Sequence, residues 1–349
     1  MTMSIPPVFN PDIHKQLQPK QQRNIAYYID GIKTGNRYIL SESITLLESS
    51  VPDKRALGTE ILNHFKNDNT STIRVGITGT PGVGKSTFIE AFGCYCISQG
   101  HKVAVLAIDP SSQVNQGSVL GDKTRMPNLS TREEAFIRPT ASGTMLGGTA
   151  IHTKETIEMC EAAGYDMVLI ETVGVGQSEI EVGFMSDVNI LLLQPGAGDE
   201  IQGIKRGIME NADIFVINKA DGALHSLAKQ SKITYRNAIQ LFHHPLEGWK
   251  MPIILVSSTE ERGLDDVFLA IAQFKEKMLY QHLFSDKRTQ QNQRWFYTKS
   301  KELIEELVFN HPEFRSNFKT LSDAIQNKSI SPSGALSRIN VILHKIIGS

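Results

Sequence analysis

The sequence is poor in cysteine and carries almost no net charge. Its 349 residues include three cysteines, Cys94, Cys96 and Cys160, which form no CxxC pair. Such a sparse, odd set is typical of a reducing cytosol and argues against a disulfide framework. A formal net charge of −1 gives no electrostatic reason to bind nucleic acid or a membrane surface. No apolar run reaches membrane-spanning length. We therefore expect a cytoplasmic protein that binds neither nucleic acid nor a membrane.

Metal-binding and secretion signals are missing as well. His243 and His244 have no cysteine or acidic partner at ligand spacing, which argues against a zinc site. Residues 1–20 are polar and contain prolines, without the apolar centre of a signal peptide, and we expect residues 1–23 to form a mobile tail. The whole chain is 40% hydrophobic and 21% charged, as in soluble globular proteins, and is long enough for one large domain with extensions or for two domains.

Apolar runs alternate with helical patterns through the middle of the chain. Several runs are apolar throughout, as expected for strands covered on both faces. This alternation predicts an α/β fold with a mostly parallel sheet, whose ligand residues gather at the carboxyl ends of the strands. The expected strands are Ile73–Thr78, Val103–Ile108, Ala135–Arg138, Met167–Ile170, Val188–Leu193, Ile214–Ile217 and Ile253–Val256.

The flanks of this region have helical patterns. Residues 24–66 read as an N-terminal helical segment with one break, at Pro52, between two helices. Apolar residues recur at helical spacing from about Gln290, and His311-Pro312 ends that helix. A turn at residues 331–334 precedes a final amphipathic helix. We therefore expect an α/β domain over residues 67–285 and a C-terminal helical segment over residues 286–349. This segment has too little core of its own to bury its amphipathic helices, which favours a homodimer, and packing on the same subunit is the alternative.

Residues 79–86 read GTPGVGKS, which is the phosphate-binding P-loop pattern. Its glycines let backbone N–H groups turn toward phosphate oxygens, and the following helix directs its N-terminus at the same anion. Lys85 can reach the β- and γ-phosphates, and the Ser86 hydroxyl can bind Mg²⁺. A glycine-rich turn without a ligand is the alternative. The predicted phosphate-binding residues are Gly79, Pro81, Gly82, Val83, Gly84, Lys85, Ser86 and Thr87.

A second motif follows the sixth predicted strand and favours guanine over adenine. Asn218-Lys219-Ala220-Asp221 is an NKxD element, in which the Asp221 carboxylate accepts N1–H and N2–H of guanine. Adenine lacks this donor pair and would leave the carboxylate unpaired. The alternative is a surface turn in which Asp221 caps a helix. Ser257, Ser258 and Thr259, after the last strand, match a weaker element whose backbone contacts the base.

Carboxylates follow two further strands. Glu171, at the end of the fourth predicted strand, can hold Mg²⁺ through water, and Gly174 leaves room for a γ-phosphate. Asp109 ends the second strand and can contact Mg²⁺ or position the attacking water. On the next loop, Asp122 and Lys123 bring opposite charges, and Lys123 can supply a cation to the transferring phosphate. The alternatives are a capping carboxylate and a solvated charged loop.

These motifs together resemble the MeaB/MMAA family of P-loop GTPases, whose bacterial members also carry the name ArgK. The resemblance covers about residues 24–345 and rests on GTPGVGKST, AIDPSS, GSVLGDKTRM, ETVGVGQSE, QPGAGDEIQGIKRGIMENADIFVINKAD and VSSTEERGLDDV. It implies a SIMIBI-class P-loop NTPase sheet with helical N- and C-terminal extensions, the latter a dimerisation segment. It also implies a chaperone of an adenosylcobalamin-dependent mutase, usually methylmalonyl-CoA mutase, which gates cofactor loading and protects the mutase.

The resemblance extends to single residues. It implies GTP or GDP with Mg²⁺ as ligands, residues 177–183 and 196–205 as switch segments, and Lys123 as a lysine of hydrolysis. Lys85, Ser86, Asp109, Asp122 and Glu171 match positions around phosphate, of which Ser86 and the three acids are the expected metal ligands. One departure is that the family usually reads Gly-Gly-Ser after Asp-Pro-Ser-Ser, whereas this chain reads Asn115-Gln116-Gly117-Ser118.

Other functions fit the sequence less well. An ATP-dependent kinase or a lysine/arginine/ornithine transport-linked ATPase is the main alternative, and the NKxD element argues against it. A metallochaperone GTPase would carry Cys/His-rich sites. An interaction protein with an inactive nucleotide site would not retain Lys85, Ser86, Asp109 and Glu171.

Overall fold

The chain folds as two compact units, Met1–Ser285 and Asp286–Ser349. The structure is a computed structural model, which describes residues 23–65, 71–109, 125–141, 148–172, 182–196, 206–240 and 242–348. Among the helices described, none combines the length and the apolar composition needed to cross a membrane.

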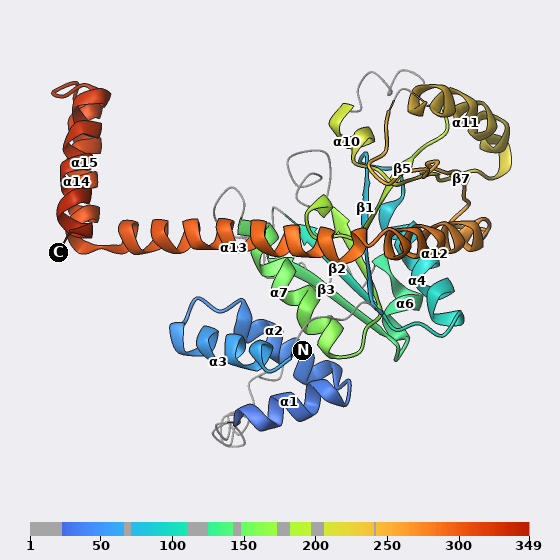
Figure 1. Cartoon of the computed structure of the whole chain (residues 1–349), viewed down its shortest axis with the longest axis horizontal. Helices are drawn as coiled ribbons and strands as arrows, with labels where there is room; N and C mark the ends of the chain where they lie inside the picture. The colour runs from blue at the N-terminus through green and yellow to red at the C-terminus, as the bar shows by residue number, and fades with distance from the viewer. Residues whose placement is uncertain are drawn as a thin grey trace, which may run out of the picture. The chain divides into compact units, whose positions relative to one another are not determined.

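A seven-stranded sheet forms the centre of the first unit (Figure 1). Its strands lie in the order β3-β2-β4-β1-β5-β6-β7, and each neighbouring pair is parallel. The α/β fold class with a parallel sheet is thereby confirmed. The strands are β1 (Ile73–Gly79), β2 (Val103–Asp109), β3 (Ala135–Ala141), β4 (Met167–Thr172), β5 (Val188–Leu193), β6 (Ile214–Ile217) and β7 (Ile253–Leu255).

Four strands extend beyond the apolar runs that predicted them. β4, for example, continues through Glu171 and Thr172, because its backbone still pairs with β1 and β2 at those residues. Burial therefore predicts the middle of each strand, and backbone pairing sets its end. The extension keeps Glu171 on the sheet, where its backbone cannot move as a loop would.

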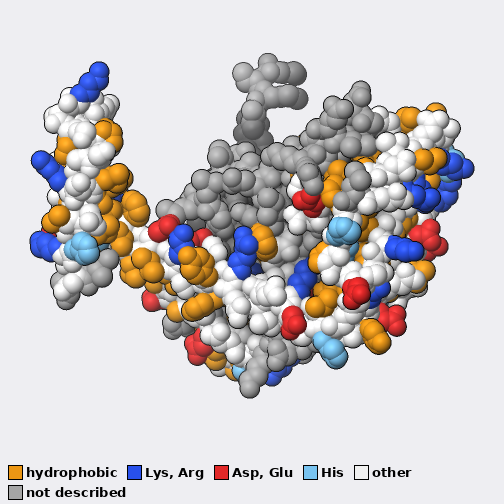
Figure 2. All heavy atoms as spheres, turned by 45° about the horizontal axis from the view of Figure 1, so that its top comes forward, with side chains coloured by type: hydrophobic (Ala, Val, Ile, Leu, Met, Phe, Trp, Pro, Cys, Tyr) orange, Lys and Arg blue, Asp and Glu red, His pale blue; other side chains and the backbone are white. Residues whose placement is uncertain are grey.

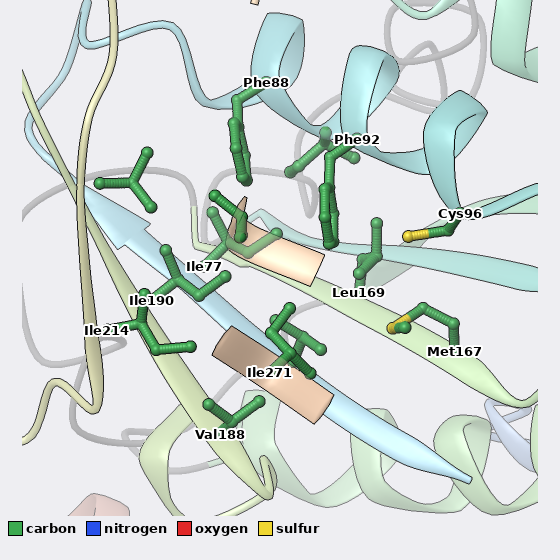
Figure 3. Close-up of a cluster of buried hydrophobic side chains, with 14 of the residues drawn as sticks. Ile77, Phe88, Phe92, Cys96, Met167, Leu169, Val188, Ile190, Ile214 and Ile271 are labelled. Atoms are coloured by element: carbon green, nitrogen blue, oxygen red, sulfur yellow. The ribbon is translucent and has the colours of Figure 1, made fainter. Parts of the chain in front are cut away.

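Helices cover both faces of the sheet (Figure 1). On one face, α4 (Lys85–Ser98), α6 (Pro127–Thr131) and α12 (Leu264–Tyr280) close the largest buried cluster. Phe88 and Phe92 of α4 stack at 5.4 Å between ring centroids, and with Cys96 they point onto the strands (Figure 3). The opposite face is covered by two groups of helices. The first group is α1 (Ile25–Lys33), α2 (Arg37–Leu47), α3 (Pro52–Asn63) and α7 (Gly148–Ala162). The second group is α10 (Arg206–Glu210) and α11 (His225–Ile239), and the short 3-10 helix η2 (Gly222–Leu224) precedes α11.

The N-terminal segment contains three helices, so the prediction of two was wrong. The missed break follows α1, where Gly35 adopts a φ of 70° and Asn36 caps α2 by accepting from the backbone of Tyr38 and Ile39. The predicted break at Pro52 is confirmed as the start of α3. Ion pairs join these helices to the sheet layer.

Two such pairs are recorded. The Arg55 guanidinium contacts both carboxylate oxygens of Glu155 on α7 at 2.6 and 2.7 Å. Arg138 of β3 donates to Glu48 at the end of α2. The N-terminal helices are thus fixed to an edge strand and to α7 by charged side chains as well as by apolar packing.

The second unit is helical. It contains most of α13 (Leu283–Asn310), and α14 (Pro312–Gln326) and α15 (Pro332–Ile347). The predicted stop at His311-Pro312 is confirmed, but α13 begins before Gln290. The predicted turn at residues 331–334 is instead the start of α15, because Ser331 caps the helix and Pro332 occupies its first turn, where no backbone N–H is needed.

Candidate nucleotide-binding site

The P-loop joins the central strand β1 to α4. Gly84 precedes the helix with a φ of 92°, and a Cβ there would lie 2.8 Å from Nδ2 of Asn218. A Cβ on Gly79 would lie 2.7 Å from the carbonyl oxygen of Leu192 on β5. Both positions therefore require glycine, one for its backbone conformation and both for close packing. The loop lies at the start of a 14-residue helix, where backbone N–H groups can bind an anion.

Lys85 folds back over this loop. Its Nζ donates to the carbonyl oxygens of Gly79, at 2.8 Å, and Thr80, at 3.3 Å, and its side chain is buried. The ammonium group is thus held by backbone dipoles within the loop. Phosphate oxygens in the loop would offer the same group a charged acceptor, which forms stronger hydrogen bonds than a carbonyl does.

The hydroxyl of Ser86 and the carboxylate of Glu171 face each other beside the loop. Ser86 Oγ donates to Glu171 Oε1 at 3.0 Å, and Glu171 is buried at the end of β4. In the described part of the chain, no three His, Cys, Asp or Glu side chains gather closely enough to hold a metal ion by themselves. A hydroxyl and a carboxylate nevertheless suit Mg²⁺, which keeps several waters and takes the rest of its ligands from phosphates.

Asn218 links three loops of the site. Its backbone N–H donates to Leu193 of β5 at 2.8 Å, and its Nδ2 donates to the Val83 carbonyl of the P-loop at 3.1 Å. Its Oδ1 accepts from the Ser258 hydroxyl at 2.7 Å. The residue is 1% exposed, so these bonds replace water that the side chain has lost. The amide therefore fixes the NKxD loop, the P-loop and the loop after β7 relative to one another.

Asp221 is oriented by hydroxyls from that last loop. Ser257 Oγ donates to Asp221 Oδ2 at 2.6 Å, and Thr259 Oγ1 donates to the same oxygen at 3.3 Å. The bonds within the described residues leave Oδ1 available to a base. Asp221 stands before η2, but its side chain forms no capping hydrogen bond, which contradicts the alternative that it serves as a helix cap.

The lysine of the same motif reaches across to the P-loop. Lys219 has a φ of 57°, and its Nζ donates to the Gly82 carbonyl at 2.6 Å. Asn218 and Lys219 thus contact the P-loop, while Asp221 contacts the loop of residues 257–259 after β7, which we call the hydroxyl loop. This arrangement suits a ligand with a phosphate tail at one end and a purine at the other.

The structure brings together most predicted site residues, but not all of them lie within its description. Asp109 is the last residue of β2, and its side chain lies outside the described part. Asp122, Lys123 and Gly174 also lie outside the described residues, together with Asn115 and Gln116 and with most of segments 177–183 and 196–205. Their roles remain predictions.

Sequence reasoning missed how the hydroxyl loop acts. It assigned Ser257, Ser258 and Thr259 to backbone contacts with a base, whereas their side chains hold Asp221 and Asn218. It also missed the acceptor role of the Val83 carbonyl. No local pattern reports such bonds, because the partners lie between 36 and 135 residues apart in the chain.

Two cysteines and an ion pair are buried in the layers around the sheet, with Cys96 in the cluster on one face and Cys160 in a cluster on the other. Burial raises the pKa of the Cys96 and Cys160 thiols well above the usual range, as expected of packing residues. Burial alone would lower the pKa of Arg74 on β1, but hydrogen bonds and charge from Glu161 outweigh it and raise it. Arg74 and Glu161 form two bonds of 2.8 and 2.7 Å.

A phosphate loop on β1, a carboxylate at the end of β4 and a guanine-reading loop after β6 define a P-loop GTPase. Comparison with known proteins gives the family. Residues 40–313 match the family described as Methylmalonyl Co-A mutase-associated GTPase MeaB, and the chain belongs to it.

Relatives over most of the chain carry related names. GTPase ArgK of Escherichia coli (strain K12) is 41% identical over 319 residues, covering 91% of this chain and 96% of that one. Methylmalonic aciduria type A homolog, mitochondrial, of Mus musculus is 40% identical over 329 residues, covering 91% and 79%. A crystal structure of an LAO/AO transport system kinase is 35% identical with a TM-score of 0.71, covering 93% of this chain and 99% of that one.

Proposed function

We propose that this GTPase is Mg²⁺-dependent and acts as a chaperone of an adenosylcobalamin-dependent acyl-CoA mutase, in the first instance methylmalonyl-CoA mutase. The observation that carries the nucleotide part is the Asp221 carboxylate, held by Ser257 and Thr259 beside an intact P-loop. The mutase part is supported by the family, which takes its description from that enzyme, and by relatives named for methylmalonic aciduria.

In this proposal the P-loop binds the triphosphate and Lys85 exchanges its carbonyl partners for β- and γ-phosphate oxygens. Ser86 and Glu171 would hold Mg²⁺, together with Asp109 and Asp122, and the ion would supply positive charge to the β- and γ-phosphates. Asp221 accepts from N1–H and N2–H of guanine, while Asn218 and Lys219 keep the P-loop against the base-binding loops. Main-chain N–H groups contributed by Gly79–Thr87 and Gly174 complete the phosphate site.

Hydrolysis depends chiefly on positioning and charge, since phosphoryl transfer needs little covalent chemistry from the protein. Asp109 would orient the attacking water, and Lys123 would approach the γ-phosphate as a cation. A partner that orders the loop carrying Lys123, or the proposed switch segments 177–183 and 196–205, would therefore change the rate. Slow turnover by the protein alone is the expected consequence.

The test is a GTPase assay with and without the purified mutase from the same organism. We expect slow hydrolysis alone and a several-fold change at saturating mutase, by analogy with partner-supplied charge in other GTPases. The Lys85→Ala variant should show no hydrolysis in either condition, which assigns the activity to this chain. An unchanged rate together with no measurable complex would contradict the chaperone role.

We further propose that the protein is a homodimer assembled through its C-terminal unit. This unit exposes apolar side chains on α13, among them Leu307 at 74% and Ile304 at 59%, and Leu336 and Val341 on α15. Orange side chains accordingly run along this unit in Figure 2. Such a surface suits burial against another copy. Light scattering should give twice the monomer mass, and a monomer at micromolar concentration would contradict the proposal.

The name of the solved relative favours a second candidate, an ATP-dependent kinase or transport-linked ATPase. The oriented Asp221 carboxylate argues against it, because adenine offers no matching donor pair. Incubation with labelled ATP and candidate acceptor proteins separates the two, since robust phosphotransfer would favour the kinase.

We also propose that the protein is cytoplasmic, like the mutase that it would assist. The three cysteines are free thiols, as expected in that reducing compartment.

A further inference from the structure

The helix α11 carries a row of basic side chains on its outer face. Lys229, Lys232 and Arg236 follow one another at spacings of three and four, which places them on one side of a helix. Lys229 and Arg236 are exposed, and Lys232 is half-buried. Residues 222–240 contain no Asp or Glu, so the charge is not balanced along the helix. We call Lys229, Lys232 and Arg236 the α11 basic stripe.

In the described part of the fold, the positive charge of the stripe is also not balanced by acidic side chains from other elements. Within the described residues, none of its three side chains takes part in a recorded ion pair or side-chain hydrogen bond, whereas Arg55, Arg74 and Lys154 of the same unit are each paired with a glutamate. In Figure 2, blue side chains gather at the right-hand edge of the surface, where Figure 1 places α11. These are the charges that an acidic partner could neutralise.

An exposed apolar side chain lies beside the stripe. Ile233 is 61% exposed and stands four residues after Lys229, on the same side of the helix. An apolar contact surrounded by charged residues is the usual arrangement of a protein–protein interface, with a dry centre and a polar rim. Three basic residues on a chain of net charge −1 are few for a nucleic acid or an anionic membrane, which are bound through larger basic surfaces.

The inner face of α11 contacts the nucleotide site. Nδ1–H of His225 donates to the carbonyl oxygen of Ala220, which lies inside the NKxD loop, at 3.2 Å. Ser231 Oγ accepts from the backbone N–H of Gly196, just after β5, at 3.0 Å. A protein bound to the outer face of α11 would therefore act on a helix that touches the guanine-binding loop and the segment after β5.

We propose that the α11 basic stripe, with Ile233 at its edge, is a docking surface for an acidic patch on the partner enzyme. The identity of that partner as the mutase rests on the proposed function, whereas the surface and the charge of its partner are read from this chain. Because α11 also contacts the NKxD loop, docking and guanine-nucleotide affinity should depend on each other.

The experiment compares the full-length protein with two charge-reversal variants for binding to the purified mutase. Lys229→Glu/Arg236→Glu reverses the stripe, and Lys54→Glu/Lys102→Glu makes the same change in net charge at exposed lysines elsewhere in the unit. Biolayer interferometry is run with GDP and with GTP, at low and at moderate salt. A milder variant, Lys229→Gln/Arg236→Gln, removes the two charges without reversing them, and is less prone to misfold. GDP affinity and intrinsic hydrolysis are measured for every variant, to show that its nucleotide site is intact.

We expect the stripe reversal to weaken mutase binding by about tenfold or more, mostly through slower association, with a smaller loss for the glutamine variant. The control variant should stay within about twofold of the wild type, since scattered surface charges contribute little. Raising the salt should weaken the wild type more than the stripe variant.

Several results would overturn the inference. If both reversed variants bind equally, the stripe has no special role, although the mutase is a partner. If the wild type binds no mutase with GDP or with GTP, the proposed function is contradicted, and the docking proposal, which rests on it, is contradicted as well. If the wild type binds phosphatidylserine vesicles through the stripe while mutase affinity is unaffected, the surface serves a membrane instead.

Discussion

Ser257 and Asp221 are joined by a hydrogen bond of 2.6 Å in which the hydroxyl donates to Oδ2 of the carboxylate. The two residues belong to different loops, one after β7 and one after β6. Among the described residues, the bond fixes one oxygen of the Asp221 carboxylate and leaves the other available to a base. We infer that Ser257 supports guanine recognition indirectly, by orienting Asp221.

Removing that hydroxyl should weaken guanine binding. The Ser257→Ala variant should lose about tenfold in GDP affinity, the value of one hydrogen bond to a charged group. Fluorescent-GDP titration measures the loss. Ser337→Ala removes a hydroxyl that donates to the carbonyl oxygen of Ser333 within α15, so it serves as the control and should bind GDP like the wild type. Equal affinity of the two variants would contradict a positioning role for Ser257.

Changing the carboxylate itself should change the base that is preferred. In Asp221→Asn one acceptor oxygen becomes an N–H donor, which no longer fits the two donors of guanine but fits the 2-oxo group of xanthine. GDP affinity should fall about 100-fold or more, and xanthosine diphosphate should become the better competitor. Competition against fluorescent GDP measures both changes. Unaltered preference would show that Asp221 does not read the base.

The dependence of GTP affinity on Mg²⁺ should require the Ser86 hydroxyl. Chelation of Mg²⁺ should lower GTP affinity of the wild type and stop hydrolysis, because the ion balances phosphate charge. The Ser86→Ala variant removes the hydroxyl that now bonds to Glu171, so its GTP affinity should respond weakly to added Mg²⁺. Titrations with and without chelator give the comparison. A variant that responds to Mg²⁺ as strongly as the wild type would remove Ser86 from the metal site.

The thiols should resist modification in the folded protein. Burial raises the pKa of Cys96 and Cys160, and to a lesser degree that of the half-buried Cys94, so the reactive thiolate is scarce at pH 8. A thiol-reactive dye should label the native chain slowly, with Cys94 first, and all three thiols at once in denaturant. Rapid native labelling of Cys96 would mean that α4 opens readily.

The Arg74–Glu161 pair should contribute strongly to stability. Glu161→Gln leaves the Arg74 charge buried and without its carboxylate, a change that typically costs about 3–5 kcal/mol. Thermal unfolding should show a large fall in Tm. Glu313→Gln, which breaks the exposed pair with Lys345, should leave the Tm nearly unchanged because water screens that pair. Similar effects of the two substitutions would contradict this ranking.

The sheet could be predicted because its strands are buried on both faces. Runs such as Val188–Leu193 are apolar throughout, and β5 has the predicted bounds. The phosphate and guanine motifs follow strands β1 and β6, whose carboxyl ends meet at one edge of a parallel sheet. Local patterns thus carry enough information to place Lys85, Ser86, Glu171 and Asp221 near one another.

Other features depend on contacts between distant residues or on backbone conformations that composition does not reveal. The sequence does not predict the break at Gly35, which lacks a proline, but it does predict the break at Pro52. The sequence also predicts a turn at Pro332, although proline is equally suited to the first turn of a helix. The bonds of Ser257 to Asp221 and of Asn218 to Val83 form only once the loops are assembled.

We infer that the Asp221 carboxylate, on the loop after β6, selects a guanine nucleotide bound to the P-loop. Isothermal titration calorimetry of the purified protein with GTP and with ATP, each with Mg²⁺, measures this selection. GTP should bind at least about 100-fold more tightly than ATP, since adenine would leave Asp221 unpaired. Equal affinities, or tighter binding of ATP, would contradict it.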